Sequence, residues 1–444
     1  MNKTSTIVAL STPPGQGGIA VVRLSGPQSG AAIEALTGKS PAEPRRAVLR
    51  SLYDDAGALL DKGLVLFFSA PASATGEDMA EFHVHGGPAV VAGVLESLTG
   101  LSGIDLAEPG DFTRRAFEAG RLDLTAVEGL ADLIAADTKA QHRQAVRQMN
   151  GALAHLCDGW RDQLVKALAY LEAEIDFPDE DLPEALSAEV VSPLMAVVED
   201  MERTLNRVGG ERIREGVQVA IIGPPNVGKS SLLNALARRE AAIVADESGT
   251  TRDVIEVALD LGGMPVVLFD TAGLREVEEG VEAEGVRRAR VRADQADIRL
   301  IMVSVETSVE DARDVLALRR SGDVVVVNKQ DLGRHNTIEG AYPLSVLTSQ
   351  GLEMLEEVLV QAVTELAGEG EGTVVTRLRH REALGAAHRA CARALEVLSS
   401  GGSAKVELAA EDVRLGVRAL GRLVGRVDVD DILDVIFRDF CIGK

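Results

Sequence analysis

The stretch that decides the fold of the central region is VQVAIIGPPNVGKSSLLNALARR, residues 217–239. The run VQVAIIG reads as a buried strand and the run SLLNALARR as a helix. Between them, Gly223, Gly228, Lys229 and Ser230 satisfy the pattern GxxxxGK[ST], in which backbone N–H groups and a lysine surround nucleotide phosphates. The sequence therefore predicts a phosphate-binding loop in an α/β domain, with the Ser230 hydroxyl offered to Mg²⁺.

Three further motifs predict which nucleotide this domain binds. Asp270-Thr-Ala-Gly273 ends the strand-like run PVVLFD, so its carboxylate can hold Mg²⁺ through water while Gly273 senses the γ-phosphate. Thr250 and Thr251 lie in the segment GTTRD, where a threonine can complete the metal shell while the γ-phosphate is present. The Asp331 carboxylate of NKQD can accept two hydrogen bonds from guanine that adenine cannot donate. We therefore expect GTP.

Two positions depart from the usual pattern of such domains. Ser345-Val346-Leu347 stands where a Ser-Ala-Lys-like loop is expected beside the base. Leu274 follows Gly273 at the place where Ras-like switches carry a glutamine that orients the attacking water, and leucine cannot hydrogen-bond water. Another group must orient the water, and the many carboxylates downstream cannot be told apart by spacing alone.

The composition argues against several classes of protein and indicates the compartment. Lys and Arg total 46 against 69 Asp and Glu, a net charge of −23, which disfavours a protein that grips nucleic acid by itself. The three cysteines lie far apart, so neither a disulfide framework nor a zinc site is indicated. No stretch reaches the ~18 to 20 apolar residues that span a bilayer. We expect a cytoplasmic protein without a membrane segment.

The chain is predicted to be multidomain, with α+β and α/β parts. Residues 1–118 are strand-like and punctuated by Gly and Pro, as in an α+β domain, and residues 119–213 are mainly amphipathic helix. Residues 214–371 alternate strands and helices as in a Ras-like P-loop domain, and residues 372–444 return to helix. The simplest assembly joins the two helical regions into one domain that receives the α/β domain as an insertion, and two separate helical domains are the alternative.

Across essentially all of its length the chain resembles the tRNA-modification GTPase family MnmE, also called TrmE. The resemblance implies a homodimer joined through N-terminal domains, which acts with the FAD-containing partner MnmG. Together they place a carboxymethylaminomethyl-type group on C5 of the wobble uridine of certain tRNAs, with the partner holding most of the tRNA. The motifs that carry the resemblance are TPPGQGGIAVVRLSG, TGEDMAEFHVHGGP, RRAFEAGRLDLTAVEGLADLI, EIDFPDE, GPPNVGKSSLLNAL, GTTRD, DTAGLRE and the terminal FCIGK.

The resemblance also implies roles for individual residues. Hydrolysis is activated by K⁺ in place of an arginine finger, with Glu282 orienting the water and Lys229 and Thr251 assisting. Ser230 and Thr251 are the Mg²⁺ ligands, and the K⁺ ligands are Asn226, Ala245, Glu247 and Thr250. A 5-formyltetrahydrofolate-type folate is held by Arg23, Glu81, Arg121 and Lys444, with Cys441 as a further candidate. The expected GTP contacts are Asn226, Val227, Gly228, Lys229, Ser230, Ser231, Ala245, Asp246, Glu247, Ser248, Gly249, Thr250, Thr251, Asp270, Thr271, Ala272, Gly273, Asn328, Lys329, Gln330 and Asp331.

Two alternatives stay open at the level of the sequence. Era-like GTPases share GTTRD and DTAG and act as switches in ribosome assembly without modification chemistry, although they usually carry a basic RNA-binding module that this chain lacks. A purely regulatory scaffold is the other alternative.

Overall fold

The computed structural model describes residues 5–176, 185–239, 242–243, 256–270, 294–333, 338–367, 373–399 and 406–427, together with 433, 436, 437, 440 and 443. These residues form two compact units, residues 1–131 with 421–444 and residues 132–420. Helices α4 (Leu124–Ile134) and α14 (Val406–Val424) cross the boundary between them. In the described residues, no helix has the length and apolarity that a membrane crossing requires.

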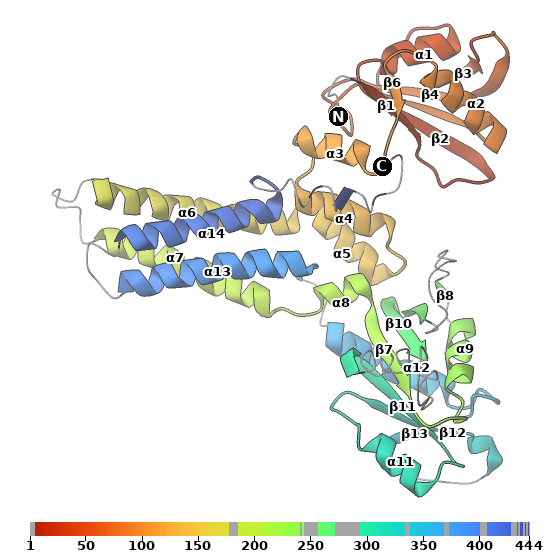
Figure 1. Ribbon diagram of the computed structural model, residues 1–444, viewed down its shortest axis with the longest axis vertical. Helices are drawn as coiled ribbons and strands as arrows, with labels where there is room; N and C mark the ends of the chain where they lie inside the picture. The colour runs from red at the N-terminus through yellow and green to blue at the C-terminus, as the bar shows by residue number, and fades with distance from the viewer. Residues whose placement is uncertain are drawn as a thin grey trace, which may run out of the picture. The chain divides into compact units, whose positions relative to one another are not determined.

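The first unit is built on a mixed sheet with strand order β3-β4-β5-β2-β1-β6 (Figure 1). Helices α1 and α2 cover one face of this sheet, where Val22, Phe82, Ile33 and Leu98 form a fully buried core. All neighbouring strands pair antiparallel except β1 and β6, which run parallel. The elements are β1 (Thr6–Leu10), β2 (Gly17–Ser25), α1 (Ser29–Thr37), β3 (Val48–Tyr53), β4 (Leu59–Phe68), β5 (Met79–Gly86), α2 (Pro88–Thr99), β6 (Ile104–Leu106) and α3 (Asp111–Glu118).

The C-terminal residues of the chain belong to this first unit. Phe437 and Phe440 are buried in a cluster with Val127 of α4 and Phe117 of α3. Gly110, just before α3, has a φ of 77°, and a Cβ there would lie 2.4 Å from the Phe437 carbonyl oxygen. The end of the chain therefore packs on residues that lie more than three hundred positions earlier in the sequence.

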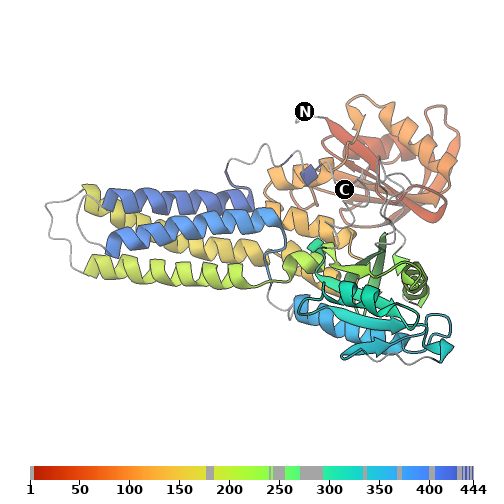
Figure 2. The same ribbon diagram turned by 60° about the horizontal axis from the view of Figure 1, so that its bottom comes forward.

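The second unit contains a set of long helices that lie side by side in both views (Figures 1 and 2). Helix α7 contacts both α6 and α13, and Gly416 of α14 approaches Cys391 of α13 and Leu164 of α6. Helices before and after the α/β domain thus form one bundle, as the simplest assembly predicted. The helices are α5 (Lys139–Met149), α6 (Ala152–Asp176), α7 (Ala185–Asn206), α8 (Gly210–Glu215), α13 (Leu378–Ser399) and α14.

The α/β domain between α8 and α13 has a twisted sheet with order β13-β12-β11-β7-β10-β9-β8. Strands β7, β10, β11, β12 and β13 pair parallel, and β9 pairs antiparallel with β10. The prediction of a multidomain α+β and α/β fold is confirmed. The elements are β7 (Val217–Ile222), α9 (Lys229–Arg239), β8 (Ala242–Ile243), β9 (Glu256–Leu261), β10 (Met264–Asp270), β11 (Ile298–Ser304), α11 (Val309–Leu316), β12 (Val324–Asn328), η1 (Gln330–Leu332), β13 (Ala341–Pro343) and α12 (Leu352–Ala367).

The strand directions explain where the predicted motifs meet. Strands β7, β10 and β12 are parallel members of one sheet, so their carboxyl ends lie along the same edge. The phosphate loop follows β7, Asp270 ends β10, and Asn328 ends β12. Open α/β sheets bind ligands at this edge.

The described cysteines lie inside the bundle. Cys157 and Cys391 are buried thiols. Burial, with a smaller contribution from the Asp412 carboxylate, raises the pKa of the Cys391 thiol to about 12. A thiol with such a pKa is protonated at neutral pH and is therefore a poor nucleophile.

Candidate nucleotide-binding site

The loop after β7 has the backbone that phosphate binding requires. Gly223 passes so close to β11 that a Cβ would lie 2.0 Å from the Met302 carbonyl oxygen. Gly228 has a φ of 103°, and Asn226 has a φ of 62°, a left-handed conformation that asparagine tolerates better than most residues. Helix α9 begins directly afterwards at Lys229, so its first N–H groups face the loop.

Lys229 lies inside this loop. Its ammonium donates hydrogen bonds to the carbonyl oxygens of Gly223, at 2.9 Å, and Pro224, at 2.8 Å. Only 7% of the residue is exposed, and this burial lowers the pKa of the Lys229 ammonium, while the nearby Asp270 carboxylate opposes that shift. A phosphate entering the loop would therefore meet a cation that has already lost most of its water.

Ser230 and Asp270 bring two oxygen donors together beside the loop. The Ser230 hydroxyl donates to a carboxylate oxygen of Asp270 at 2.5 Å, although Ser230 lies in the first turn of α9 and Asp270 ends β10. Hard oxygen donors of this kind suit Mg²⁺, which takes few protein ligands and completes its shell with phosphate oxygens and water. The pair therefore fits the predicted metal position.

The Asn328-Lys329-Gln330-Asp331 segment is tied to both neighbouring loops. The Asn328 amide donates to the Val227 carbonyl oxygen at 2.8 Å, and its own oxygen accepts from the Val346 N–H at 3.1 Å. The Ser345 hydroxyl donates to one oxygen of Asp331 at 2.6 Å. These bonds hold the base-reading carboxylate at a fixed place relative to the phosphate loop.

The loop 345–347 makes hydrogen bonds to Asp331 and Asn328 despite its unusual residues. Ser345 orients Asp331 through its hydroxyl, and Val346 contributes only a backbone N–H, which any residue but proline supplies. Leu347 is 86% exposed at the rim. The departure from a Ser-Ala-Lys-like sequence thus changes an exposed side chain and leaves the hydrogen bonds of the base site intact.

The sequence did not predict that Glu306 belongs to this site. This residue follows β11, and its carboxylate accepts from the Lys329 ammonium at 2.7 Å. Lys329 has a φ of 64°, so its backbone turns sharply between β12 and Asp331. An acidic residue after a buried strand gave no signal by itself, because nothing in the local sequence connects position 306 to position 329.

These residues enclose one cavity of about 740 Å³. Its walls come from the phosphate loop, the first turns of α9, the 328–331 segment and the 345–347 loop. A volume of this size is in the range that holds a nucleotide. The lining residues that the sequence predicted as GTP contacts are Asn226, Gly228, Ser231, Asn328, Lys329 and Asp331.

Among the remaining predicted GTP contacts, Lys229, Ser230 and Asp270 have the positions described above and are not among the residues that line the cavity. The others divide into two groups. Val227 contributes a carbonyl oxygen to Asn328, and the side chain of Gln330 donates to the Val327 carbonyl oxygen at 3.3 Å. The predicted residues that lie outside the described part of the chain are Ala245, Asp246, Glu247, Ser248, Gly249, Thr250, Thr251, Thr271, Ala272, Gly273 and Glu282.

A second polar cluster lies in the first unit, where Arg23 and Glu81 face each other across strands β2 and β5. The Arg23 guanidinium donates to Glu81 at 3.0 Å, and the other Glu81 oxygen is 3.0 Å from Nε2 of His83. The Gly443 carbonyl oxygen accepts from Arg23 at 3.4 Å and from the Ser11 hydroxyl at 2.9 Å. The C-terminal FCIGK segment therefore reaches this cluster.

Two of the four residues predicted for folate are thus in contact. The stem of the Arg121 side chain lies near Gly76. Lys444 and Cys441 lie outside the described residues, although Gly443 stands between them in sequence. His83 was not predicted, and the alternating pattern of EFHVH could have placed it on the face of β5 that carries Glu81.

The fold and the site together define a P-loop nucleotide-binding domain. A family model described as the MnmE helical domain matches residues 124–441, and one described as GTP-binding protein TrmE N-terminus matches residues 6–121. The tRNA modification GTPase MnmE of Parvibaculum lavamentivorans is 55% identical over 441 residues, covering 99% of this chain and 100% of the relative. That of Maricaulis maris is 52% identical over 442 residues, with the same coverage.

The chain belongs to the MnmE family of tRNA modification GTPases. It is a GTP hydrolase, and the resemblance read from its sequence is confirmed.

Proposed function

We propose that this protein is a K⁺-activated GTPase that modifies C5 of the wobble uridine of certain tRNAs together with an FAD-containing MnmG partner. The observation that carries the proposal is the match to MnmE relatives along 99% of the chain, which includes all domains and not the GTPase domain alone. The product is a carboxymethylaminomethyl-type group, and the proposal places the reaction in the cytoplasm.

The phosphate loop supports the hydrolysis part of the proposal. Lys229 would neutralise the β- and γ-phosphates, and Ser230 with Thr251 would hold Mg²⁺, which supplies charge stabilisation when bound. Asp270 stands beside Ser230, where it can reach the metal through water. Because Leu274 cannot hydrogen-bond water, Glu282 is our candidate for the group that orients it.

Asn226 is the one proposed potassium ligand that the structure describes, and its position in the phosphate loop is compatible with this role. Asn226 is exposed and has a left-handed backbone, so its amide oxygen can serve as a hard ligand at the loop. We propose Ala245, Glu247 and Thr250 as the other ligands. A hydrolysis rate that is the same in Na⁺ and K⁺ buffers would contradict this part of the proposal.

The cluster of Arg23, Glu81 and His83 fits a folate. The Glu81 side chain is 15% exposed, and each of its oxygens keeps a lone pair that could accept from a pterin amide edge. We propose a 5-formyltetrahydrofolate-type donor held by Arg23, Glu81, Arg121 and Lys444, and we assign Cys441 a supporting role. The donor would supply the one-carbon unit, and these residues would bind and orient it.

The charge of the chain supports a division of labour between partners. With a net charge of −23 the subunit is poorly suited to hold tRNA by itself, so we propose that MnmG contacts most of the tRNA. We also propose that the protein is a homodimer joined through its N-terminal domains.

Nucleoside analysis of bulk tRNA tests this function. A strain that lacks the gene should lose the wobble-uridine modification, and a plasmid copy of the wild-type gene should restore it. A copy with Asp331→Asn should fail to restore it if GTP binding is required. Normal tRNA nucleosides together with misprocessed ribosomal RNA would overturn the proposal in favour of a ribosome-assembly switch.

A further inference from the structure

The chain enters and leaves the GTPase domain, residues 217–367, at neighbouring points of the second unit. It enters through α8, which leads into β7, and after α12 it reaches α13 through residues 373–377. The last turn of α4 carries Asp132, which contacts both connections. This arrangement links helices outside the GTPase domain to its covalent entry and exit.

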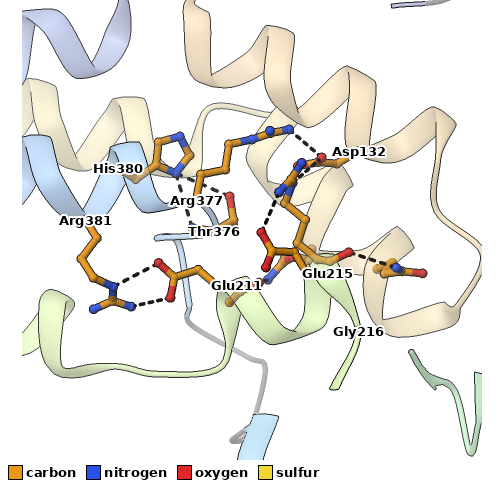
Figure 3. Close-up of polar contacts among 12 residues, drawn as sticks. Asp132, Glu211, Glu215, Gly216, Thr376, Arg377, His380 and Arg381 are labelled. Atoms are coloured by element: carbon orange, nitrogen blue, oxygen red, sulfur yellow. Dashed lines mark hydrogen bonds and ion pairs between the residues drawn. The ribbon is translucent and has the colours of Figure 1, made fainter. Parts of the chain in front are cut away.

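Asp132 accepts from two arginines with the same carboxylate oxygen. Nε of Arg214, at the end of α8, donates at 3.0 Å, and a terminal nitrogen of Arg377 donates at 2.6 Å. Figure 3 shows the Arg377 guanidinium directed at Asp132. The side chains are 18%, 31% and 19% exposed for Asp132, Arg214 and Arg377. Removing the Asp132 carboxylate would leave two partly buried guanidinium groups near each other, with Arg214 still paired to Glu215 at 3.1 Å.

Further bonds fix α8 from both sides. From α5, Gln141 donates to the Arg214 carbonyl oxygen at 3.2 Å and Gln144 donates to that of Gly210 at 3.0 Å. From α13, Arg381 forms a bidentate pair with Glu211 at 3.0 and 3.1 Å (Figure 3). The entry helix is therefore held between α5 and α13, and α13 is part of the bundle.

A third contact reaches the strand that ends at the nucleotide site. The Ala140 N–H of α5 donates to the Gly263 carbonyl oxygen at 3.0 Å, in the turn between β9 and β10. Strand β10 runs from Met264 to Asp270, whose carboxylate accepts from Ser230. One end of β10 thus meets helix α5 and the other end meets the phosphate loop.

We propose that Asp132 is a positioning residue that couples nucleotide occupancy of the GTPase domain to the stability of the helical bundle. The carboxylate joins the entry and exit of the domain to α4, and α5 then holds the β9–β10 turn. Nucleotide binding stabilises the GTPase domain, and through these contacts the bundle shares that stabilisation. The proposal requires nucleotide binding but does not depend on K⁺, folate or MnmG.

A single tryptophan makes unfolding of the helical bundle measurable by fluorescence. This residue, Trp160, is buried in α6 and donates from Nε1 to Asp200 of α7 at 2.9 Å. Tryptophan fluorescence therefore follows the bundle, whereas a nucleotide binds the other domain. A change in the Trp160 melting temperature caused by nucleotide measures the coupling between them.

The experiment follows thermal unfolding of the full-length chain by tryptophan fluorescence, with and without saturating GDP and Mg²⁺. In the wild type, GDP should raise the Trp160 transition by several degrees. In Asp132→Asn that rise should be largely lost, while GDP affinity measured by titration at 25 °C stays nearly unchanged. Asp137→Asn is the matched control, because Asp137 is an exposed residue five positions away, and this variant should keep the full rise.

The outcomes distinguish coupling from simple destabilisation. If Asp132 only stabilises the fold, Asp132→Asn lowers the melting temperature but keeps the rise with GDP, and the proposal is wrong. A wild-type transition that GDP does not move, despite measured binding, also overturns it. Absence of GDP binding would instead remove the nucleotide site itself.

Two milder substitutions test the same coupling if Asp132→Asn does not fold. Arg377→Gln keeps the Arg214 pair and should retain an intermediate rise with GDP. Asp132→Glu keeps the charge and should restore most of the rise. An equal, full rise in Arg377→Gln and the wild type would count against the role of the exit connection.

Discussion

The two ends of the GTPase sheet are built in different ways. At the carboxyl ends of the strands, eight consecutive residues from Gly223 to Ser230 supply most of the phosphate site. At the opposite end, the contacts join residues far apart in the chain, and Asp132 and Arg377 are separated by 245 positions. The first end is encoded by a local motif, and the second exists only once the tertiary structure has formed.

The polar groups at the two ends of the sheet also differ in whether they can bind a ligand or are already paired with one another. At the nucleotide end, exposed Asn226 and Ser231 and buried Asn328 line a cavity that a ligand can enter. At the opposite end, here called the junction end, Arg214, Arg377 and Arg381 already have carboxylates as partners. Changes at the first end should therefore lower nucleotide affinity or turnover, and changes at the second should lower the free energy of unfolding.

The largest effect is expected for Lys229→Ala. Removing the buried ammonium that faces the phosphates should weaken GTP binding by about 10³-fold, since losing one member of a desolvated charge pair costs ~2 to 5 kcal/mol. Isothermal titration would measure it. The unfolding free energy without nucleotide should change much less, and a variant with unaltered GTP affinity would remove Lys229 from the phosphate site.

Glu282→Ala should separate chemistry from binding. If this carboxylate orients water mainly in the transition state, kcat should fall by about 10² to 10³ while GTP affinity stays nearly intact. Single-turnover assays with K⁺ would compare it with Ala substitutions at the neighbouring acidic positions, which are Glu276, Glu278, Glu279 and Glu284. A large loss at one of those positions instead would place the water-orienting group there.

At the junction end, Gly209→Ala should destabilise the fold and leave nucleotide affinity unchanged. Gly209 has a φ of 111°, and a Cβ there would lie 1.6 Å from the Ala367 carbonyl oxygen. Strain and overpacking together should lower the unfolding free energy by roughly 2 to 4 kcal/mol, measured by denaturant titration.

The matched control for that variant is Gly159→Ala. Gly159 lies within α6, and a Cβ there would meet no atom within 4 Å. This substitution should stabilise the chain by roughly 0.5 to 1 kcal/mol because alanine favours helix over glycine. Equal effects of the two substitutions would contradict the tight packing at the junction.

A smaller effect is expected for Ser345→Ala. The hydroxyl donates to Asp331, so its loss should cost ~0.5 to 1.5 kcal/mol of GTP affinity, which is about twofold to tenfold. Competition binding with GTP and a triphosphate lacking the base would localise the change. If both ligands weaken equally, Ser345 acts on the loop as a whole and not on base recognition.

The sequence allowed prediction of the parts of the candidate site that are contiguous in the chain, but not of the contacts between distant segments. Gly223, Lys229 and Ser230 could be assigned because a strand, a loop and a helix follow one another without interruption. Helical periodicity likewise predicted the bundle.

The missed contacts share one physical property. Glu306 with Lys329, and Asp132 with Arg214 and Arg377, are ion pairs between distant segments, and a charged residue looks the same in the sequence whether it is paired or solvated. His83 is a partial exception, since strand alternation places it on the face that carries Glu81.

Asp331, held by Ser345, is the residue that we expect to make this site specific for guanine. The most direct measurement is the affinity of wild type and Asp331→Asn for GTP and for xanthosine triphosphate. The wild type should prefer GTP, and the variant should lose GTP affinity and gain the xanthosine nucleotide, because the new amide pairs with a carbonyl where the carboxylate paired with an amino group. An unchanged preference for GTP in Asp331→Asn would show that Asp331 does not recognise the base.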